Sequence, residues 1–166
     1  MSRIKDIAII VEAPVQFFSI KNSLDELLAQ GKSVDIVVPH LEDYKVVTGA
    51  ASKLLKSKSY DFVTTKDIND REYKICLAPY PVINFGKIKA KYRIRYGYSI
   101  LTAKPNPTYL PGHKLWFDAI ICHGPQEAEM MKAYAETYSI SPMKYDGFVK
   151  SKGDGRPVVL YLPTSG

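Results

Sequence analysis

Short, mostly apolar runs alternate along the chain with longer segments in which apolar residues recur at helical spacing, and residues 7–11, IAIIV, are apolar throughout. A strand buried on both faces reads as a continuous run of Val, Ile and Leu, because helices cover it on either side. The alternation therefore predicts an α/β fold with a Rossmann-like parallel sheet flanked by helices. The expected strands are residues 7–11, 34–38, 60–63, 73–78 and 117–122, with a further short strand at 142–145.

Three segments between these runs carry the helical pattern. Pro14 stands where a first helical turn tolerates proline, and Gly31 stands where glycine commonly ends a helix, so residues 14–31 predict one helix. Residues 44–55 predict a second. Pro125 opens a third, which we expect to bury the apolar positions at helical spacing: Ala128, Met131, Ala135 and Tyr138.

The segment KIKAKYRIRY, residues 87–96, places a cation at every second position. On a strand, successive side chains point to opposite faces, so one face would carry five charges and the other would be apolar. These five account for most of the chain's net charge of +6. Two explanations stay open. The lysines could block edge-to-edge strand pairing, or the strip could bind a polyanion. The cations are Lys87, Lys89, Lys91, Arg93 and Arg95.

Length and cysteine content limit the class of protein. The 166 residues suffice for one domain with a real core. Cys76 and Cys122 each lie within an apolar run, which predicts buried free thiols and fits a cytoplasmic protein. No apolar stretch approaches the roughly 20 residues of a membrane span, and the run after Lys5 is too short for a secretory signal.

Polar residues follow several of the expected strands, and ligands of open parallel sheets bind outside the carboxyl ends of the strands. Glu12 follows the first strand. His123 and Gly124 follow residues 117–122, where a helix start would direct backbone N–H groups at an anion, although Glu127 already brings negative charge there. His123 is the main catalytic candidate, and a structural histidine is the alternative. Weaker candidates at other strand ends are His40, Thr64, Thr65 and Pro79.

The turn after the first strand contains no glycine, whereas a dinucleotide fingerprint needs glycines so that the backbone can approach the pyrophosphate. We therefore expect no cofactor, and the histidines and cysteines lack the spacing of a metal site. At the end of the basic strip, Gly97 permits a backbone turn, and Arg95 could hold a phosphate with two hydrogen bonds. Tyr96 could stack on a ligand or simply pack in the core.

Three blocks, KYRIRYGYSI, FDAIICHGPQEAEMM and PVVLYLPTSG, occur in this order between residues 91 and 166. Together they resemble the CDP-glycerol glycerophosphotransferase family of teichoic acid and capsule synthesis. The resemblance implies a GT-B arrangement, in which residues 1–150 form the Rossmann-like acceptor-side domain. Residues 151–166 would then be a linker and the first strand of a carboxyl-terminal nucleotide-binding domain.

That resemblance implies the acceptor-binding half of a transferase, which moves a glycerol-phosphate or glycosyl group from a nucleotide-activated donor to a cell-surface polymer. The donor would bind the carboxyl-terminal domain, and the acceptor would be anionic or lipid-linked, with peripheral contact at the inner face of the membrane. Many members carry a proposed catalytic histidine, in His-Gly, where this chain has Tyr96-Gly97, and tyrosine is a poor base near neutral pH. Either His123 takes that role, or the chain is a divergent relative with other chemistry, so the catalytic candidates are His123 and Tyr96. The expected substrate-binding residues are Glu12, Lys91, Arg93, Arg95, Gly97 and Gly124.

Two alternatives remain. A nucleotide-sugar glycosyltransferase of polysaccharide synthesis would have the same layout. A non-enzymatic basic domain could instead bind nucleic acid through cations interleaved with Tyr92 and Tyr96. On a strand the tyrosines would face away from the cations, so nucleic acid is the less expected partner.

Overall fold

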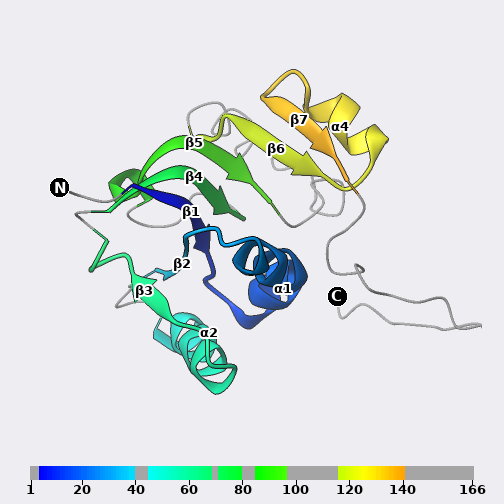
Figure 1. Cartoon of the computed structure of the whole chain (residues 1–166). Helices are drawn as coiled ribbons and strands as arrows, with labels where there is room; N and C mark the ends of the chain where they lie inside the picture. The colour runs from blue at the N-terminus through cyan, green and yellow to red at the C-terminus, as the bar shows by residue number, and fades with distance from the viewer. Residues whose placement is uncertain (1–3, 40–44, 69–70, 80–84, 97–115, 141–166) are drawn as a thin grey trace, which may run out of the picture.

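A computed structural model describes residues 4–39, 45–68, 71–79, 85–96 and 116–140. Its described part contains a sheet of seven strands, all parallel, in the order β3-β2-β1-β4-β5-β6-β7 (Figure 1). The predicted α/β class with a Rossmann-like parallel sheet is thereby confirmed. The strands are β1 (Lys5–Ile10), β2 (Val34–Val38), β3 (Phe62–Thr64), β4 (Glu72–Ala78), β5 (Lys89–Arg95), β6 (Ala119–Cys122) and β7 (Glu136–Ser139).

Strands are added to the sheet on both sides of β1. The chain runs outward from β1 through β2 to β3, then returns to the other side of β1 and continues from β4 to β7. The strand order therefore reverses between β1 and β4. In open parallel sheets such a reversal leaves a crevice outside the carboxyl ends of the two strands, and ligands bind there.

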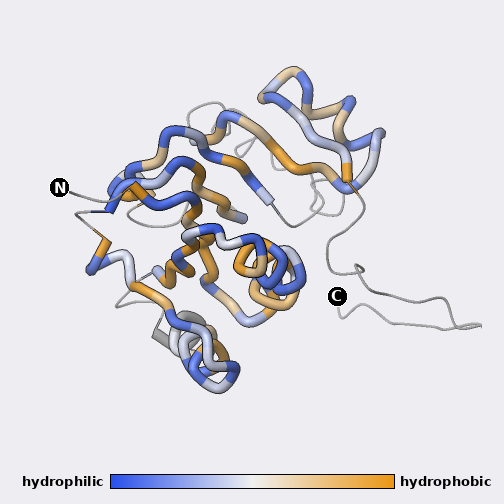
Figure 2. The backbone as a smooth tube through the Cα atoms, viewed as in Figure 1, coloured by the Kyte–Doolittle hydropathy of each residue, from blue (hydrophilic) through white to orange (hydrophobic). Residues whose placement is uncertain are grey.

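Helix α1 (Pro14–Ala29) begins at its proline and ends just before Gly31, which has φ of +72°. Both predicted ends are confirmed. Its buried face packs with α2 (Lys45–Ser57) on one face of the sheet. Figure 2 shows hydrophobic residues gathered where α1 meets the sheet. The core on this face is formed by Ile7, Ile9, Val11, Phe17, Ile20, Leu24, Ile36, Val38, Ala51, Leu55 and Tyr96.

A second apolar cluster joins residues of β1, β2 and β4 to Phe85, Ile88 and Phe117. A third, smaller cluster packs α4 (Pro125–Met131) onto β6 through Ala128 and Met131. Cys76 and Cys122 belong to these clusters, and both are buried free thiols as predicted. The sheet is thus covered by packed side chains on both faces, which explains the continuous apolar runs of its central strands.

The segment after α4 differs from the prediction. The sequence predicted a helix that continues to Tyr138, whereas α4 ends at Met131 and residues Glu136–Ser139 form β7. Tyr138 is 45% exposed rather than buried. Pairing with β6, from Ala119 opposite Glu136 onward, outweighs the helical spacing of the apolar positions. The strand predicted at 142–145 lies outside the described residues.

The basic strip also needs correction. Residues Phe85–Lys87 form a short 3₁₀ helix, so Lys87 is not part of the strand. Strand β5 lies between β4 and β6, and the edge-strand explanation therefore fails for the strand as a whole. Its pairing with β6 is confined to Ile94 and Arg95, whereas its pairing with β4 runs from Lys89 to Arg95. Among the described residues, β5 therefore lacks a paired strand on the β6 side from Lys89 to Arg93.

A charged cluster ties together the amino ends of β1, β2 and β4. The carboxylate of Asp35, which is 8% exposed, accepts hydrogen bonds from Lys5 Nζ at 2.5 Å, Arg71 at 2.7 Å and the Tyr73 hydroxyl at 2.8 Å. Burial alone would raise the pKa of Asp35, but these donors outweigh burial and hold that pKa below its usual range. The buried charge of Asp35 is thereby compensated, and the cluster stabilises the fold.

No helix in the described part of the chain is both long enough and apolar enough to span a membrane.

Candidate functional site

Three of the predicted site residues lie along one edge of the sheet. Glu12 follows β1, Arg95 ends β5, and His123 follows β6. The strands that carry them stand in the order β1, β4, β5, β6. At about 4.8 Å per strand, the ends of β1 and β5 lie roughly 10 Å apart, and β6 lies one spacing further. The strand order, which the sequence does not give, therefore brings Glu12 and Arg95 within reach of one ligand.

Glu12 is a buried carboxylate at the point where the strand order reverses. It is 8% exposed, and none of the described cations forms an ion pair with it. The side chain of Gln16 holds this turn, since its Oε1 accepts the N–H of Glu12 at 2.6 Å and that of Ala13 at 3.2 Å. Burial raises the pKa of Glu12, and a hydrogen bond with Gln16 opposes the rise only in part. Glu12 thus combines a fixed backbone with an elevated proton affinity.

Arg95 is half-buried and brings a positive charge to the same edge. Its Nε donates to the carbonyl of Pro79 at 3.1 Å, which fixes the side chain across the end of β4. Burial lowers the pKa of Arg95, and the charge of nearby Glu127 opposes that effect. Because the guanidinium group stays charged in any protein environment, Arg95 can stabilise negative charge that arrives beside it.

His123 and Gly124 form the turn between β6 and α4. Gly124 has φ of +115°, a conformation that favours glycine, and it precedes Pro125 at the first helical position. The carboxylate of Glu127, which is 4% exposed, accepts the N–H of His123 at 2.6 Å. This helix start therefore already holds a carboxylate, which argues against the anion-binding role expected for Gly124. The half-buried His123 remains at the edge.

Tyr96 belongs to the core and not to the crevice. It is 1% exposed, packs within the cluster beneath α1, and donates its hydroxyl to the carbonyl of Ile10 at 2.6 Å. A hydroxyl held in this way is a poor general base, and its reach to a substrate is blocked by its own packing. The geometry argues against the catalytic role expected for Tyr96 and supports the packing alternative.

Two further substrate-binding predictions lie away from this edge. The guanidinium of Arg93 sits 5.1 Å from the centre of the Phe85 ring and donates to the carbonyl of Ile88 at 3.1 Å, so it is held within the protein. Lys91 is exposed nearer the amino end of β5. Gly97 and His40 lie outside the described residues. Thr64 donates its hydroxyl to Asp67 at 2.6 Å and shapes the turn after β3.

Two residues that shape this edge were not among the predicted site residues. Gln16 stands three positions after Ala13, the residue that precedes α1, and Glu127 stands three after Gly124. Glu or Gln at this helix position commonly bonds back to the chain before the helix, so the spacing was a usable signal. Gln16 positions the backbone of Glu12, and Glu127 positions the backbone of His123.

Thiol and metal chemistry find no support at this edge. Burial raises the pKa of Cys76 to about 12 and that of Cys122 to about 11, so both stay protonated near neutral pH. Within the described ranges, no three or more His, Cys, Asp or Glu side chains are placed to hold a metal ion.

No family model, no curated protein and no solved structure matches this chain.

Proposed function

We propose that this chain is the acceptor-binding lobe of a transferase that moves a glycerol-phosphate group from a nucleotide-activated donor to a cell-surface polymer. One observation carries the proposal: a buried carboxylate, Glu12, lies at the reversal of strand order, with the cation Arg95 two strands away. Ligands of parallel α/β sheets bind at such a reversal. The three blocks that resemble the glycerophosphotransferase family supply the substrate class.

Glu12 is our candidate for the general base. A carboxyl group whose pKa is raised by burial accepts a proton more readily near neutral pH than an exposed one does. In the transfer step, the acceptor hydroxyl oxygen forms a bond to the terminal phosphorus of the donor diphosphate. The bond from that phosphorus to the cytidylate oxygen breaks, CMP leaves with the electron pair, and the hydroxyl proton passes to the Glu12 carboxylate.

Arg95 would stabilise the negative charge that the transferred phosphate carries in this step. Its guanidinium is anchored on Pro79, so little reorganisation is needed when the phosphate arrives. Gln16 is a positioning residue, because it fixes the backbone that carries Glu12. The donor itself would bind a second lobe, as the GT-B resemblance implies, and transfer would take place at the inner face of the cell membrane.

The test uses the full-length gene product with CDP-glycerol and membranes that carry lipid-linked acceptor, and CMP release is measured. We expect Glu12→Gln to lower kcat by about 10²- to 10⁴-fold, the usual contribution of a general base. Glu26→Gln, an exposed change of the same kind on α1, is the matched control and should keep full activity. A Glu12→Gln enzyme with undiminished turnover would refute the assignment of the base.

A parallel assay with UDP-sugars separates the two donor classes. If sugar nucleotides are consumed and CDP-glycerol is not, the chain belongs to a glycosyltransferase of the same layout. If neither donor is consumed, the transferase proposal fails.

A further inference from the structure

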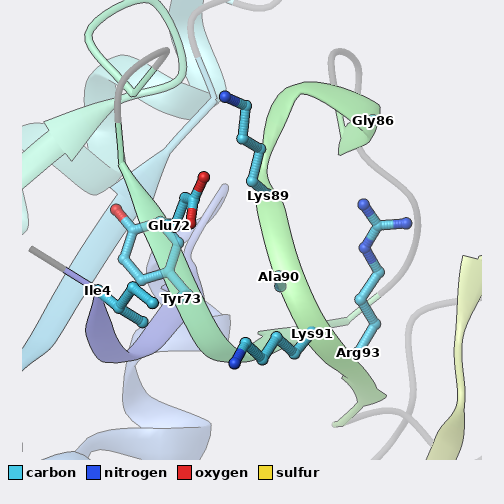
Figure 3. Close-up of a pocket in the computed structure, with 8 residues that line it drawn as sticks. All are labelled: Ile4, Glu72, Tyr73, Gly86, Lys89, Ala90, Lys91 and Arg93. Atoms are coloured by element: carbon cyan, nitrogen blue, oxygen red, sulfur yellow. The ribbon is translucent and has the colours of Figure 1, made fainter. Parts of the chain in front are cut away.

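A shallow pocket of about 290 Å³ opens at the opposite edge of the sheet, where β4 and β5 begin (Figure 3). Figure 3 shows Lys89 and Lys91 extending from β5 toward the β4 side, where Ile4, Glu72 and Tyr73 lie. Its volume is at the small end for ligand sites and suits a compact polar group. The lining residues are Ile4, Glu72, Tyr73, Gly86, Lys89, Ala90, Lys91 and Arg93.

This pocket is separate from the crevice at the carboxyl edge. Lys89 and Arg95 are the two ends of β5, and six residues of strand span roughly 20 Å. A ligand group bound beside Lys89 would therefore not touch Glu12 or Arg95. Whatever binds in the pocket occupies a second site on the same sheet.

The lining of the pocket carries a net positive charge, because Lys89, Lys91 and Arg93 face one carboxylate, Glu72, which stands opposite Lys89 in the sheet. Asp35, the buried carboxylate at this edge, is committed to Lys5 and Arg71, and Asp6 forms an ion pair with Lys74 at 2.7 Å. Glu72 is the one carboxylate in the lining. Among the residues that the structure describes, neither Lys89 nor Lys91 forms an ion pair.

The wall of the pocket is held in place before any ligand arrives. The guanidinium of Arg93 is fixed by the Phe85 ring and the carbonyl of Ile88, and its Nε is buried without an acceptor in the described part of the chain. On the β6 side, strand pairing begins only at Ile94, so no described strand covers the lysine-bearing half of β5. The β4 side of the pocket is held by the pairing of β4 with β5, so the lysines project from a fixed strand.

We propose that this pocket binds the phosphate group of an anionic ligand, with Lys89 and Lys91 as its ammonium donors. Alternate residues on one strand lie roughly 7 Å apart, and Figure 3 shows the two ammonium groups pointing apart, so they suit two neighbouring phosphates of a chain. Lysine is a common phosphate ligand and acts as a point charge. The inference does not depend on the proposed transferase and would hold for a protein with any other chemistry at the carboxyl edge.

The experiment titrates the whole 166-residue chain, labelled with ¹⁵N, with inorganic phosphate, and measures affinity for soluble poly(glycerol phosphate) by calorimetry. We expect amide shifts at Gly86 and along Lys89–Lys91. The double variant Lys89→Gln/Lys91→Gln should bind the polymer at least about tenfold more weakly, since each cation contributes on the order of a fewfold to tenfold in affinity. Glu72→Gln should bind a fewfold more tightly, because it removes the one carboxylate of the lining.

A matched control tests whether the loss of affinity is specific to the two lysines of the pocket. Lys53→Gln/Lys56→Gln removes two exposed lysines of α2 and changes the net charge by the same amount. If that variant loses as much affinity as the pocket variant, or if phosphate shifts amides at Glu12 and His123 instead, the pocket proposal is overturned. Circular dichroism checks that every variant is folded.

Two further arms identify the source of the phosphate. Vesicles of phosphatidylglycerol in phosphatidylcholine present it as a lipid headgroup, and poly(glycerol phosphate) presents it free in solution. Binding to either that depends on Lys89 and Lys91 supports the site and names its ligand. A single-stranded RNA oligomer that binds more tightly than both, with equal loss in the control variant, would contradict it.

Discussion

The assignment of Tyr96 to the core can be tested by removing one atom. In Tyr96→Phe the ring still fills its place beneath α1, but the carbonyl of Ile10 loses the hydroxyl that now donates to it at 2.6 Å. A buried neutral hydrogen bond contributes about 1 kcal/mol net, and an unsatisfied buried partner adds to the loss. We expect the free energy of unfolding to fall by about 1.5 kcal/mol, a factor of roughly ten in the unfolding equilibrium.

Urea unfolding measures this change directly. Trp116 is the one tryptophan of the chain, and its ring lies 5.9 Å from that of Phe85, so its fluorescence reports on tertiary packing. With an m-value of about 2 kcal/mol/M, the midpoint should fall by roughly 0.7 M with no change in slope. Tyr138→Phe is the matched control, because its hydroxyl also forms a hydrogen bond, to Glu136 at 2.7 Å, but the side chain is 45% exposed.

Two outcomes would refute the reasoning. If Tyr96→Phe unfolds at the same urea concentration as the wild type, or if Tyr138→Phe falls as far, burial is not what gives this hydrogen bond its weight. If Tyr96→Phe keeps its stability but abolishes turnover of the full-length gene product, Tyr96 acts in catalysis and its assignment to the core is wrong.

Two other perturbations probe the fold. Asp35→Asn removes the charge that pairs with Lys5 and Arg71 and should lower stability by about 1.5 kcal/mol near neutral pH, because the two cations left behind are about a third exposed and can be hydrated. Because the folded-state pKa of Asp35 is lowered, this contribution is present above the ordinary carboxylate pKa and is lost as the pH falls through the lowered value, so urea midpoints of wild type and variant should converge in acid. Gly31→Ala should cost about 1 kcal/mol because its φ is +72°, whereas Gly49→Ala within α2 should stabilise by about 0.5–1 kcal/mol, and thermal unfolding would show opposite shifts in Tm. Equal shifts for the two glycine variants would contradict the backbone explanation.

The central strands were predictable because their sequence reports their surroundings. The sequence predicts β2 with its observed bounds, and β1 and β4 within two residues, since a strand covered on both faces is largely apolar. Likewise Pro14 and Gly31 marked the two ends of α1 through their own backbone restrictions. Where the local backbone preference and the pattern of burial predict the same element, a single sequence is enough to locate that element.

The sequence predicts a helix where β7 forms, because the residues of β7 continue the helical spacing of apolar positions that begins in α4. Ala128, Met131, Ala135 and Tyr138 are spaced as on one helix face, yet only the first three are buried or half-buried. What decides the outcome is the free edge of β6, which pairs with Glu136–Ser139 and lies outside any local window. A segment rich in β-branched and aromatic residues, such as 137–140, was the available signal.

The candidate site was half predictable for a related reason. Glu12, Arg95 and His123 were recognisable as strand-end residues, but their separation depends on the strand order, which is a long-range property. The predicted site residues also differ in exposure and in what surrounds them, which the sequence does not show. Glu12 is buried but keeps 8% exposure, Glu127 occupies the helix start beside His123, and Tyr96 is 1% exposed in the core.

Strand β5 shows why a charge pattern does not by itself define a binding surface. The four cations of the strand alternate regularly, but the sheet divides them. Where β6 pairs with the strand, around Arg95, the guanidinium groups are drawn onto Pro79 and the Phe85 ring, since arginine can keep its charge while its planar head stacks and its N–H groups bond to carbonyls. Where β6 is absent, Lys89 and Lys91 stay exposed, because a strongly hydrated ammonium group gains nothing from burial. Lysine therefore occupies the part of β5 that has no strand on the β6 side, and arginine occupies the part near β6. A polyanion would contact Lys89 and Lys91 but not the two arginines.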